Sequence, residues 1–495
     1  MPQSESVTPA SPETLPQEFS PDLHHTLRQH FDTLAPSWDR WKRRNRYYHD
    51  DLKKLAQFFI PPQSTVLEIG CGTGDLLAAV QPSRGIGVDF SPRMIEQAQA
   101  KYPHLVFYCG VAEQLTQEVL TPPQPLDYIV ISETLGSLLD IQQTLQQVSH
   151  FCDRHTRLIL TFHNFLWQPL LRCAESLGLR CPQPQQSWLS MTDVKNLLSI
   201  TGFLPTQSGR RCLVPKAIPL LAGLLNRCIA PLPGLNHLCL TNYIVARKVI
   251  TPPQPCTCSI VVPARNEAGN IAATLHRIPP LGQHTEVIFV EGNSQDQTWE
   301  MIQSVIQTPR AGFTLKALQQ HGRGKADAVH LGFAACTGDI LMILDADLTV
   351  QPEDLKHFFE VISQGRGEFI NGARLVYPRS SAAMPWLNML ANKFFSLVFS
   401  FLLGQPIKDT LCGTKVLWRE DFQRMDAERS YFGDFDPFGD FELLFGAARF
   451  GLQIVDVPVR YQPRSYGQSN IAHVKEGLTL LKMCWFASKK IKFIA

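Results

Sequence analysis

Short apolar runs alternate with helical stretches along most of this chain, and the alternation starts twice. The runs of the first half are Thr65–Ile69, 85–88, 126–132 and 158–162; those of the second half are 259–262, 286–290 and 339–344. Such alternation is typical of parallel, doubly wound sheets. A proline-rich break at 251–255 separates the two series. We therefore predict two doubly wound α/β domains.

The domain limits follow from the same patterns. Residues 1–23 are polar and rich in proline at their start, which predicts a disordered leader. Residues 24–250 form the first predicted domain, 251–256 the linker and 257–495 the second domain. We expect no signal peptide, because no basic start precedes an apolar run. We also expect no membrane span, since no stretch of about 18 apolar residues is uninterrupted.

Charge and cysteine content narrow the environment and the partners. The formal net charge is +2, which gives no bulk electrostatic reason to expect a nucleic-acid partner. The 13 cysteines are scattered rather than paired in a framework. That distribution is typical of a reducing compartment, so we expect a cytoplasmic location.

A glycine-rich turn follows the first apolar run, in the segment 66–74, Val-Leu-Glu-Ile-Gly-Cys-Gly-Thr-Gly. Gly70, Gly72 and Gly74 allow a tight turn and the close approach of a ligand. The next apolar run ends at Asp89, whose carboxylate can accept hydrogen bonds from a ribose diol. The pattern predicts a nucleoside-containing cofactor. A plain tight turn and a nicotinamide dinucleotide site are the alternatives, although the latter favours G-x-G-x-x-G.

The glycine-rich turn and the segment 89–94 closely resemble class I S-adenosylmethionine-dependent methyltransferases, over about residues 25–250. The resemblance implies a Rossmann-like domain in which the loop cradles the methionine part of S-adenosylmethionine and the acid holds the ribose. Relatives often carry Gly-Asp-Ala-Glu after the third strand, where this chain has Gly-Val-Ala-Glu at 110–113. The cofactor residues implied are Glu68, Gly70, Gly72, Gly74, Asp89, Met94 and Glu113.

No motif identifies the methyl acceptor. Ser132, Glu133 and His163 follow apolar runs, where open α/β sheets bind ligands. Histidine exchanges a proton near neutral pH, which makes His163 a candidate general base. A histidine that only makes a structural hydrogen bond is the alternative. The aromatic and basic segment 38–48 is a candidate cap for this cleft, or an ordinary surface helix.

In the second half, a buried run leads into Asp345 and Asp347. Their i, i+2 spacing predicts that both point to the same side at the edge of the sheet. Two like charges held close are unfavourable unless a cation joins them, and oxygen ligands favour Mg²⁺ or Mn²⁺. Such an ion would stabilise the charge on a departing nucleoside diphosphate. A pair of loop acids that cap the helix expected at 351–361 is the alternative.

Three polar loops accompany this carboxylate pair, at 259–267, 290–298 and 322–327. Together they closely resemble family-2 inverting glycosyltransferases of the GT-A fold, over about residues 257–470. The resemblance implies a nucleotide-sugar donor. The residues expected to contact the donor are Pro263, Arg265, Glu267, Glu291, Asp296 and Lys325.

Within that family the chain most resembles dolichyl- or polyprenyl-phosphate sugar synthases, on the segments 372–374, 409–413 and 464–469. The resemblance implies that Arg374 and Arg464 hold the lipid phosphate, supported by Ser396 and Ser469. A guanidinium fork matches phosphate oxygens. Three positions depart from the family pattern: Asn392 where arginine is frequent, Glu291 where aspartate is usual, and Thr349 where glutamine is common.

A lipid phosphate is already anionic and attacks without a strong base. Asp440 and Glu442 are therefore candidate bases only for a hydroxyl acceptor, and a pair of acids at a helix N-terminus is the alternative. Apolar segments at 384–403 and 217–229, with a basic aromatic stretch at 481–493, favour association with an anionic membrane surface. Ordinary core helices would give similar patterns.

These patterns predict a bifunctional enzyme with S-adenosylmethionine and Mg²⁺ or Mn²⁺ as cofactors. One half transfers methyl to an unknown acceptor; the other transfers sugar to polyprenyl or dolichyl phosphate at the cytoplasmic membrane face. The residues assigned to sugar transfer are Asp345, Asp347, Arg374, Arg464 and Asp440. The alternative is sugar transfer to another hydroxyl, with the methyltransferase half as a non-catalytic binding module.

Overall fold

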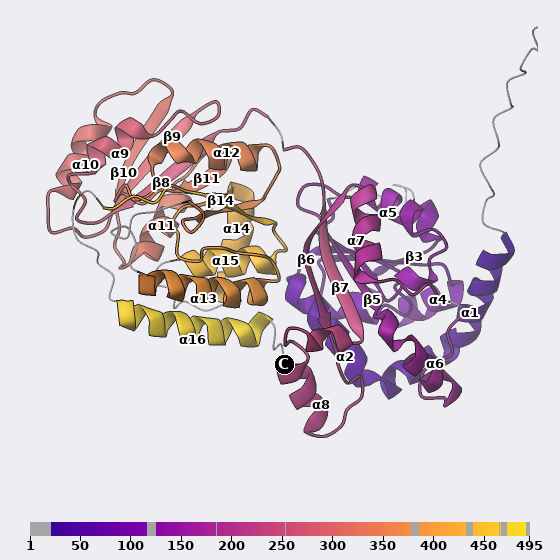
Figure 1. The fold of residues 1–495 in the computed structure, drawn as a ribbon. Helices are drawn as coiled ribbons and strands as arrows, with labels where there is room; N and C mark the ends of the chain where they lie inside the picture. The colour runs from indigo at the N-terminus through magenta and orange to yellow at the C-terminus, as the bar shows by residue number, and fades with distance from the viewer. Residues whose placement is uncertain are drawn as a thin grey trace, which may run out of the picture.

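The computed structural model describes residues 21–115, 125–184, 186–252, 254–377, 386–431, 439–464, 466 and 473–491. These residues form two α/β domains, each built on a seven-stranded sheet with helices packed on it (Figure 1). The predicted fold class is therefore confirmed. Residues 1–20 of the predicted leader lie outside the described residues, and the first helix begins at Pro21.

The first sheet has the order β3-β2-β1-β4-β5-β7-β6. Its parallel strands are β1 (Thr65–Ile69), β2 (Arg84–Asp89), β3 (Val106–Cys109), β4 (Tyr128–Ser132) and β5 (Arg157–His163). Two antiparallel strands, β6 (Phe203–Arg211) and β7 (Thr241–Lys248), complete it. The chain reverses its strand order between β1 and β4, and open α/β sheets bind ligands at the carboxyl ends of strands beside such a reversal.

Helices cover both faces of this sheet and its carboxyl edge. They are α1 (Pro21–Arg44), α2 (Arg46–Phe59), α3 (Asp75–Ala79), α4 (Pro92–Lys101), α5 (Ile141–His150), α6 (Gln168–Ser176), α7 (Met191–Ile200) and α8 (Leu221–Leu224). Their ends follow local rules of sequence. At α4, for example, Pro92 occupies the first turn and the Ser91 hydroxyl accepts the backbone N–H of Met94 at 3.2 Å.

The second sheet has the order β10-β9-β8-β11-β13-β12-β14. Its strands are β8 (Cys258–Ala264), β9 (Thr285–Glu291), β10 (Phe313–Gln319), β11 (Ile340–Ile343), β12 (Phe369–Ala373), β13 (Lys415–Trp418) and β14 (Ile454–Pro458). Only β13 runs antiparallel to its neighbours among these strands. The carboxyl ends of the other strands therefore share one edge, which places the loops after β8, β9 and β11 together.

The helices of the second domain are α9 (Ile271–Arg277), α10 (Thr298–Ile306), α11 (Lys325–Ala334), α12 (Leu355–Ser363), α13 (Trp386–Leu403), α14 (Arg419–Ala427), α15 (Asp440–Arg449) and α16 (His473–Ile491). The long helices α13 and α16 run side by side along one side of the domain (Figure 1). Among the described residues, no helix combines the length and the apolar character needed to cross a membrane.

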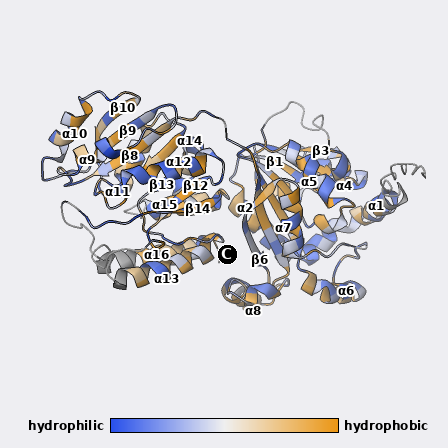
Figure 2. Cartoon of the chain, turned by 45° about the horizontal axis from the view of Figure 1, so that its top comes forward, coloured by the Kyte–Doolittle hydropathy of each residue, from blue (hydrophilic) through white to orange (hydrophobic). Residues whose placement is uncertain are grey.

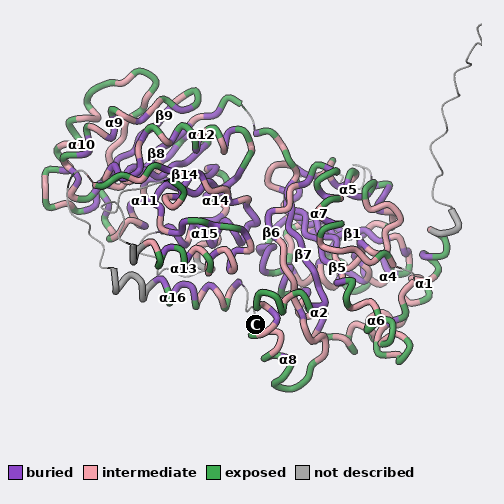
Figure 3. Tube along the Cα trace, viewed as in Figure 1, coloured by how far each residue is buried: buried purple, intermediate pink, exposed green. Residues whose placement is uncertain are grey.

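A buried ionic junction joins the two domains. Arg157, with 1% of its side chain exposed, places Nη2 2.8 Å from Oε1 of Glu368, which is 4% exposed. Arg247 Nε lies 3.5 Å from the other oxygen of Glu368, and Arg157 Nε donates to the carbonyl of Phe450. Side chains of α2 and α15 also belong to one continuous apolar cluster. Figure 3 shows buried residues along the sheets of both domains.

We expect Glu368→Gln to lower the free energy of unfolding by about 3–5 kcal/mol, because it leaves two buried guanidinium groups without their carboxylate. Denaturant titration followed by far-ultraviolet circular dichroism measures the loss. Glu353→Gln is the matched control: Glu353 pairs with Arg277 at the surface and is 53% exposed. Its loss should cost under about 1 kcal/mol. Equal effects of the two variants would contradict a structural role for the buried junction.

Candidate active sites

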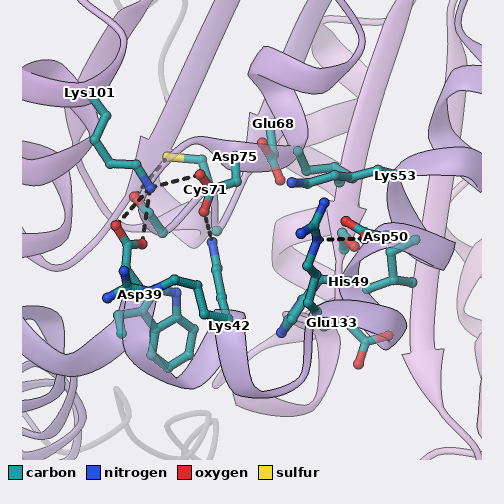
Figure 4. A pocket seen from close by; sticks show the side chains of 18 residues that line it. Asp39, Lys42, His49, Asp50, Lys53, Glu68, Cys71, Asp75, Lys101 and Glu133 are labelled. Atoms are coloured by element: carbon teal, nitrogen blue, oxygen red, sulfur yellow. Dashed lines mark hydrogen bonds and ion pairs between the residues drawn. The ribbon is translucent and has the colours of Figure 1, made fainter. Parts of the chain in front are cut away.

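A cavity of about 560 Å³ opens at the carboxyl edge of the first sheet (Figure 4). Its walls come from α1, α2, the glycine-rich turn after β1, and Ser132 and Glu133 at the end of β4. The cavity therefore lies at the reversal of strand order between β1 and β4, where the fold favours a bound nucleotide.

The glycine-rich turn has a backbone that only glycine adopts without strain. Gly70, Gly72 and Gly74 have φ angles of +73°, +53° and +77°. A Cβ on Gly70 would stand 2.2 Å from Thr134 Oγ1, and one on Gly74 2.8 Å from the Phe107 ring. The turn is therefore closed against the protein at Gly70 and Gly74.

Asp89 fixes the turn to the end of β2. One carboxylate oxygen accepts the backbone N–H of Gly72 at 2.9 Å, and the other accepts that of Ser91 at 3.0 Å. Burial raises the pKa of Asp89 above its ordinary value, and the two backbone donors oppose that rise. Asp89 thus lies directly behind the turn rather than on the cavity wall.

The other predicted cofactor residues occupy different places. Glu68 lines the cavity, accepts the backbone N–H of Leu77 at 3.0 Å, and is buried. Burial raises the pKa of Glu68 to about 8. Met94 is buried in the first turn of α4. Glu113 lies away from the cavity wall and accepts the backbone N–H groups of Leu139 and Asp140 at 3.0 and 3.3 Å.

Helix α1 is tied across the turn by charged contacts that no motif in the sequence indicates. Nζ of Lys42 and Nζ of Lys101 each lie 2.7 Å from a carboxylate oxygen of Asp75, and Lys101 also forms an ion pair with Asp39 (Figure 4). The indole N–H of Trp38 lies close to Gly72, is buried, and finds no acceptor among the described residues. An unpartnered buried donor beside the turn fits a ligand that carries hydrogen-bond acceptors.

Glu133, on the cavity wall, pairs with His163. Glu133 has a left-handed backbone, with φ +58°, and its Oε2 lies 2.8 Å from Nδ1 of His163. The Tyr48 ring stacks on His163, and its hydroxyl lies 3.5 Å from Nε2. Burial works to raise the pKa of Glu133, but His163 outweighs it and lowers that pKa below its ordinary value. Strained backbone of this kind is typical of functional sites.

In the second domain, Asp345 and Asp347 stand in the turn that follows β11. The strand ends at Ile343, so strand alternation does not set the direction of these side chains, contrary to our reasoning from the spacing. Asp345 Oδ1 lies 2.6 Å from Nζ of Lys325, and Asp347 Oδ2 lies 2.8 Å from Nη2 of Arg464. Each carboxylate is therefore neutralised by its own side-chain cation.

Arg464 bridges two loops of this site. Its other terminal nitrogen lies 2.9 Å from Oε1 of Glu267, in the loop after β8. Burial raises the pKa of Glu267 to about 7, against the influence of Arg464. The side chains of two neighbouring acids hold these loops through hydrogen bonds to the backbone. Asp296 accepts the backbone N–H of Ala268 at 3.2 Å, and Glu291 accepts that of Ser294 at 2.5 Å.

Lys325 approaches the turn through a space that only glycine leaves open. A Cβ on Gly413 would stand 2.0 Å from Asp345 Oδ2 and 2.3 Å from Lys325 Nζ. Burial works to lower the pKa of Lys325, but Asp345 and Asp440 outweigh it and raise that pKa well above its ordinary value. Asp440 is itself buried, 3.7 Å from Nζ of Lys415. Of the other predicted donor residues, Pro263 is part of β8, and Arg265 is exposed in the loop that follows.

The predicted phosphate-binding residues have protein partners. Asp409 accepts Nε and Nη2 of Arg374 at 2.7 and 2.9 Å, and Asn392 donates to the same carboxylate at 2.8 Å. Ser396 donates its hydroxyl to the carbonyl of Ile407. Ser469 lies outside the described residues. Asp409 is thus a member of the arginine site that the sequence patterns did not identify as a charge partner.

The described residues contain no group of three or more His, Cys, Asp or Glu side chains arranged to hold a metal ion. The oxygen donors of Asp345 and Asp347 nevertheless have the chemistry that Mg²⁺ and Mn²⁺ prefer. In the structure each of these carboxylates already forms an ion pair with a basic side chain, Lys325 or Arg464. The pair therefore fits a divalent ion that shares its coordination with a ligand.

Comparison with known families agrees with this division into two sites. Residues 67–158 match the family model described as a methyltransferase domain, and residues 259–425 match the model described as glycosyl transferase family 2. The chain therefore carries a methyltransferase domain and a family-2 glycosyltransferase domain, and both predicted resemblances are confirmed.

Curated relatives match the second domain. The chain is 28% identical over 227 residues to glycosyltransferase AglJ of Haloferax volcanii, covering 46% of this chain and 70% of that protein. It is 26% identical over 220 residues to dolichol-phosphate mannosyltransferase of Pyrococcus furiosus, covering 43% and 58%. It is 23% identical over 223 residues to undecaprenyl-phosphate 4-deoxy-4-formamido-L-arabinose transferase of Enterobacter sp., covering 44% and 63%. The last two matches thus span less than two thirds of the relative.

Solved structures match each half. A SAM-dependent methyltransferase from Thermotoga maritima aligns with a TM-score of 0.35 and 18% identity, over 45% of this chain and 99% of that one. Glucosyl-3-phosphoglycerate synthase from Mycobacterium tuberculosis aligns with a TM-score of 0.35 and 19% identity, over 48% and 80%.

The raised pKa of Glu68 has a consequence for stability. Above its ordinary pKa of 4.5 the unfolded chain releases this proton, while the folded protein keeps it up to about pH 8. Each pH unit in this window therefore costs the folded state about 1.4 kcal/mol. We expect Glu68→Gln to gain stability relative to the wild type as the pH rises from about 5 to about 8. Denaturant titrations across this range measure the difference.

Glu96→Gln is the control, because Glu96 is exposed on α4 and its loss should leave the pH profile unchanged. A constant difference between Glu68→Gln and the wild type across this range would show that Glu68 ionises as an ordinary glutamate.

Proposed function

We propose that the protein is a bifunctional transferase. Its first domain uses S-adenosylmethionine as the methyl donor, and its second transfers a sugar from a nucleotide-sugar to a polyprenyl or dolichyl phosphate at a membrane surface. The observation that carries the second activity is the turn after β11, where Lys325 and Arg464 each hold one of two neighbouring carboxylates. That turn concentrates the charges needed to bind a diphosphate and release it.

Asp345 and Asp347 are the residues that would hold a divalent ion, which when bound would stabilise negative charge on the leaving nucleoside diphosphate. Lys325 supplies a fixed positive charge beside them, and its contact with Asp345 keeps it protonated. Arg464 forms two charge-assisted contacts with carboxylates, and its planar fork is equally suited to phosphate oxygens. We assign Arg464 to binding of the acceptor phosphate. The phosphate would compete with Asp347 and Glu267 for contact with the guanidinium group of Arg464.

The names of two relatives support a lipid-phosphate acceptor, since they specify dolichol phosphate and undecaprenyl phosphate. Helix α13 exposes Leu390, Phe394 and Leu397, and α16 exposes Leu481 and Trp485. Basic residues of α16 accompany them, with Lys489 and Lys490 in its last turn. An exposed apolar face with neighbouring lysines suits peripheral binding to an anionic bilayer.

A hydroxyl acceptor would need a general base, and Asp440 is the candidate. Its burial beside Lys415, and its influence on Lys325, favour a role in balancing charge. All 13 cysteines are unpaired, which supports a reducing compartment and hence the cytoplasmic face of the membrane.

In the first domain, we assign the cavity beside the glycine-rich turn to S-adenosylmethionine. The turn admits the ligand at Gly72, Asp89 orients the turn, and Glu68 is placed to receive a cationic group of the ligand. The paired Glu133 and His163 then stand at the acceptor side, where His163 can take a proton.

We expect the wild type to bind S-adenosylmethionine, and Asp89→Ala to weaken binding by about 1–3 kcal/mol, because the turn at Gly72 loses the hydrogen bonds to a charged carboxylate that orient it. Isothermal calorimetry measures both affinities. Asp193→Ala serves as the control, because Asp193 caps α7 at the surface and touches no part of the cavity. Wild-type protein that binds no S-adenosylmethionine would refute the assignment.

For sugar transfer, Asp345→Ala and Asp347→Ala should each lower the rate by about 10²-fold or more, because charge on the leaving diphosphate loses its stabilisation. Methyl transfer should be nearly unchanged in both. The assay uses a short polyprenyl phosphate, a panel of nucleotide-sugars and mass measurement of the product. Asp426→Ala, at an exposed acid of α14, is the matched control.

Arg464→Ala should instead weaken use of the phosphate acceptor while donor binding persists.

Full sugar transfer by the two aspartate variants, or by wild type in excess chelator, would exclude the proposed metal role.

A further inference from the structure

One segment of the methyltransferase domain leaves the sheet beside the acceptor side of its cavity. Arg211, the last residue of β6, pairs with Thr241, the first residue of β7, and Thr241 pairs with His163. The connecting residues 212–240 include α8, η5 (Leu225–Ile229) and η6 (Leu235–Leu238). The register therefore places this segment at the edge of the sheet that carries His163 and Glu133.

Hydrogen bonds hold the segment against the helices that wall the cavity. Lys216 Nζ donates to Asn45 Oδ1, between α1 and α2, at 2.6 Å. The Asn226 amide donates to the Tyr47 hydroxyl at 3.1 Å. On its other side, Trp167 Nε1 donates to the carbonyl of Leu238 at 2.8 Å, which joins η6 to η4 (Phe165–Trp167). Residues 212–240, which we call the border segment, are thus fixed on the helices that wall the cavity.

Exposed apolar side chains cover the outer surface of the border segment and of η4 beside it. We call it the leucine rim and define it by six exposed residues: Phe165, Leu166, Leu220, Leu221, Leu224 and Leu238. Leu220 is 95% exposed and has a left-handed backbone with φ +61°, which disfavours a leucine. A strained leucine that projects into solvent stabilises nothing within the fold, so its place indicates contact with something outside it.

Charge identifies the chemistry of that contact. The sequence contains no Asp or Glu between Asp193 and Glu267, yet this stretch carries Lys216 and Arg227 inside the border segment. The α13 region shows the same asymmetry, with no acid between Glu368 and Asp409. Exposed leucines with cations and without acids match the surface of an anionic bilayer.

The leucine rim also lies on the same side of the molecule as the apolar helices of the second domain. In both views α8 and α6 lie along the lower side, as do α13 and α16 (Figures 1 and 2). The buried ionic junction fixes the two domains to each other. A single flat membrane could therefore meet both apolar surfaces at once.

We propose that the leucine rim docks the methyltransferase domain on an anionic bilayer, and that its methyl acceptor is a membrane-borne lipid or lipid-linked molecule. This inference rests on the proposed methyltransferase activity. In the reaction the methyl group leaves the sulfonium of S-adenosylmethionine and bonds to an acceptor oxygen or nitrogen. S-adenosylhomocysteine is released, and the proton of the acceptor passes to the pair formed by His163 and Glu133.

The test is flotation with vesicles of phosphatidylglycerol and phosphatidylcholine, compared with vesicles of phosphatidylcholine alone. We expect the wild type to bind the anionic vesicles more strongly, and Leu220→Glu/Leu224→Glu to lower the partition coefficient about tenfold or more. Ile200→Glu is the matched control, because Ile200 is 64% exposed near the opposite end of β6. It should bind like the wild type. Leu397→Glu/Trp485→Glu reports separately on α13 and α16.

A second experiment measures the transfer of a labelled methyl group from S-adenosylmethionine to the components of a membrane extract. Label should enter the organic phase with the wild type, and far less with Leu220→Glu/Leu224→Glu, while calorimetry shows unchanged cofactor binding. Vesicle binding by that variant equal to wild type would overturn the inference, as would label found only in water-soluble products. Conversion of a dimer to a monomer by that variant would also overturn it, because the rim would then be a protein interface. Absence of cofactor binding by wild type would instead refute the proposed function.

Discussion

The buried contact between Arg157 and Glu368 determines how the whole molecule is arranged. Arg157 begins β5 and Glu368 immediately precedes β12, so the junction lies at the amino ends of strands in both domains. Catalytic groups of α/β sheets gather at the carboxyl ends. His163 ends β5 and Arg374 follows β12, so each candidate site lies at the strand end away from the junction. The fusion therefore fixes the two sites in space without obstructing either.

The pair Asp345 and Asp347 in one site and the buried Glu68 in the other differ in how their charge is balanced. At the glycosyltransferase turn, Lys325 and Arg464 keep Asp345 and Asp347 paired with positive charge. In the methyltransferase cavity, Glu68 has no cation at ion-pair distance among the described residues, and burial raises its pKa to about 8. Carboxylates that exchange a side-chain cation for a metal ion stay ionised throughout, because a positive charge is always beside them. A site that receives a cationic ligand can instead hold a neutral acid until that ligand arrives.

The sequence patterns identified the elements because apolar runs and glycine turns act locally. The run 65–69 became β1 at the predicted bounds, and the turn at Gly70 adopted the left-handed backbone that glycine permits. Contacts between distant residues left no such signal. The bidentate pair of Arg374 with Asp409, and the salt bridge of Arg157 with Glu368, join positions that only the folded sheet brings together. The end of β11 before Asp345 was also invisible, because the apolar run continues to Leu344.

Net charge conceals the most informative electrostatic feature of this chain. The formal total of +2 arises from nearly equal numbers of acids and bases, which suggests an even surface. Their distribution is uneven, since acids are absent from 194–266 and 369–408. Each of these stretches contains exposed leucines, Leu220 in the first and Leu397 in the second. Removing acids lowers repulsion from anionic lipid headgroups, and exposing leucines adds apolar contact with the bilayer. Two domains with different folds and different chemistry thus share the same local composition, which is explained if both bind one membrane.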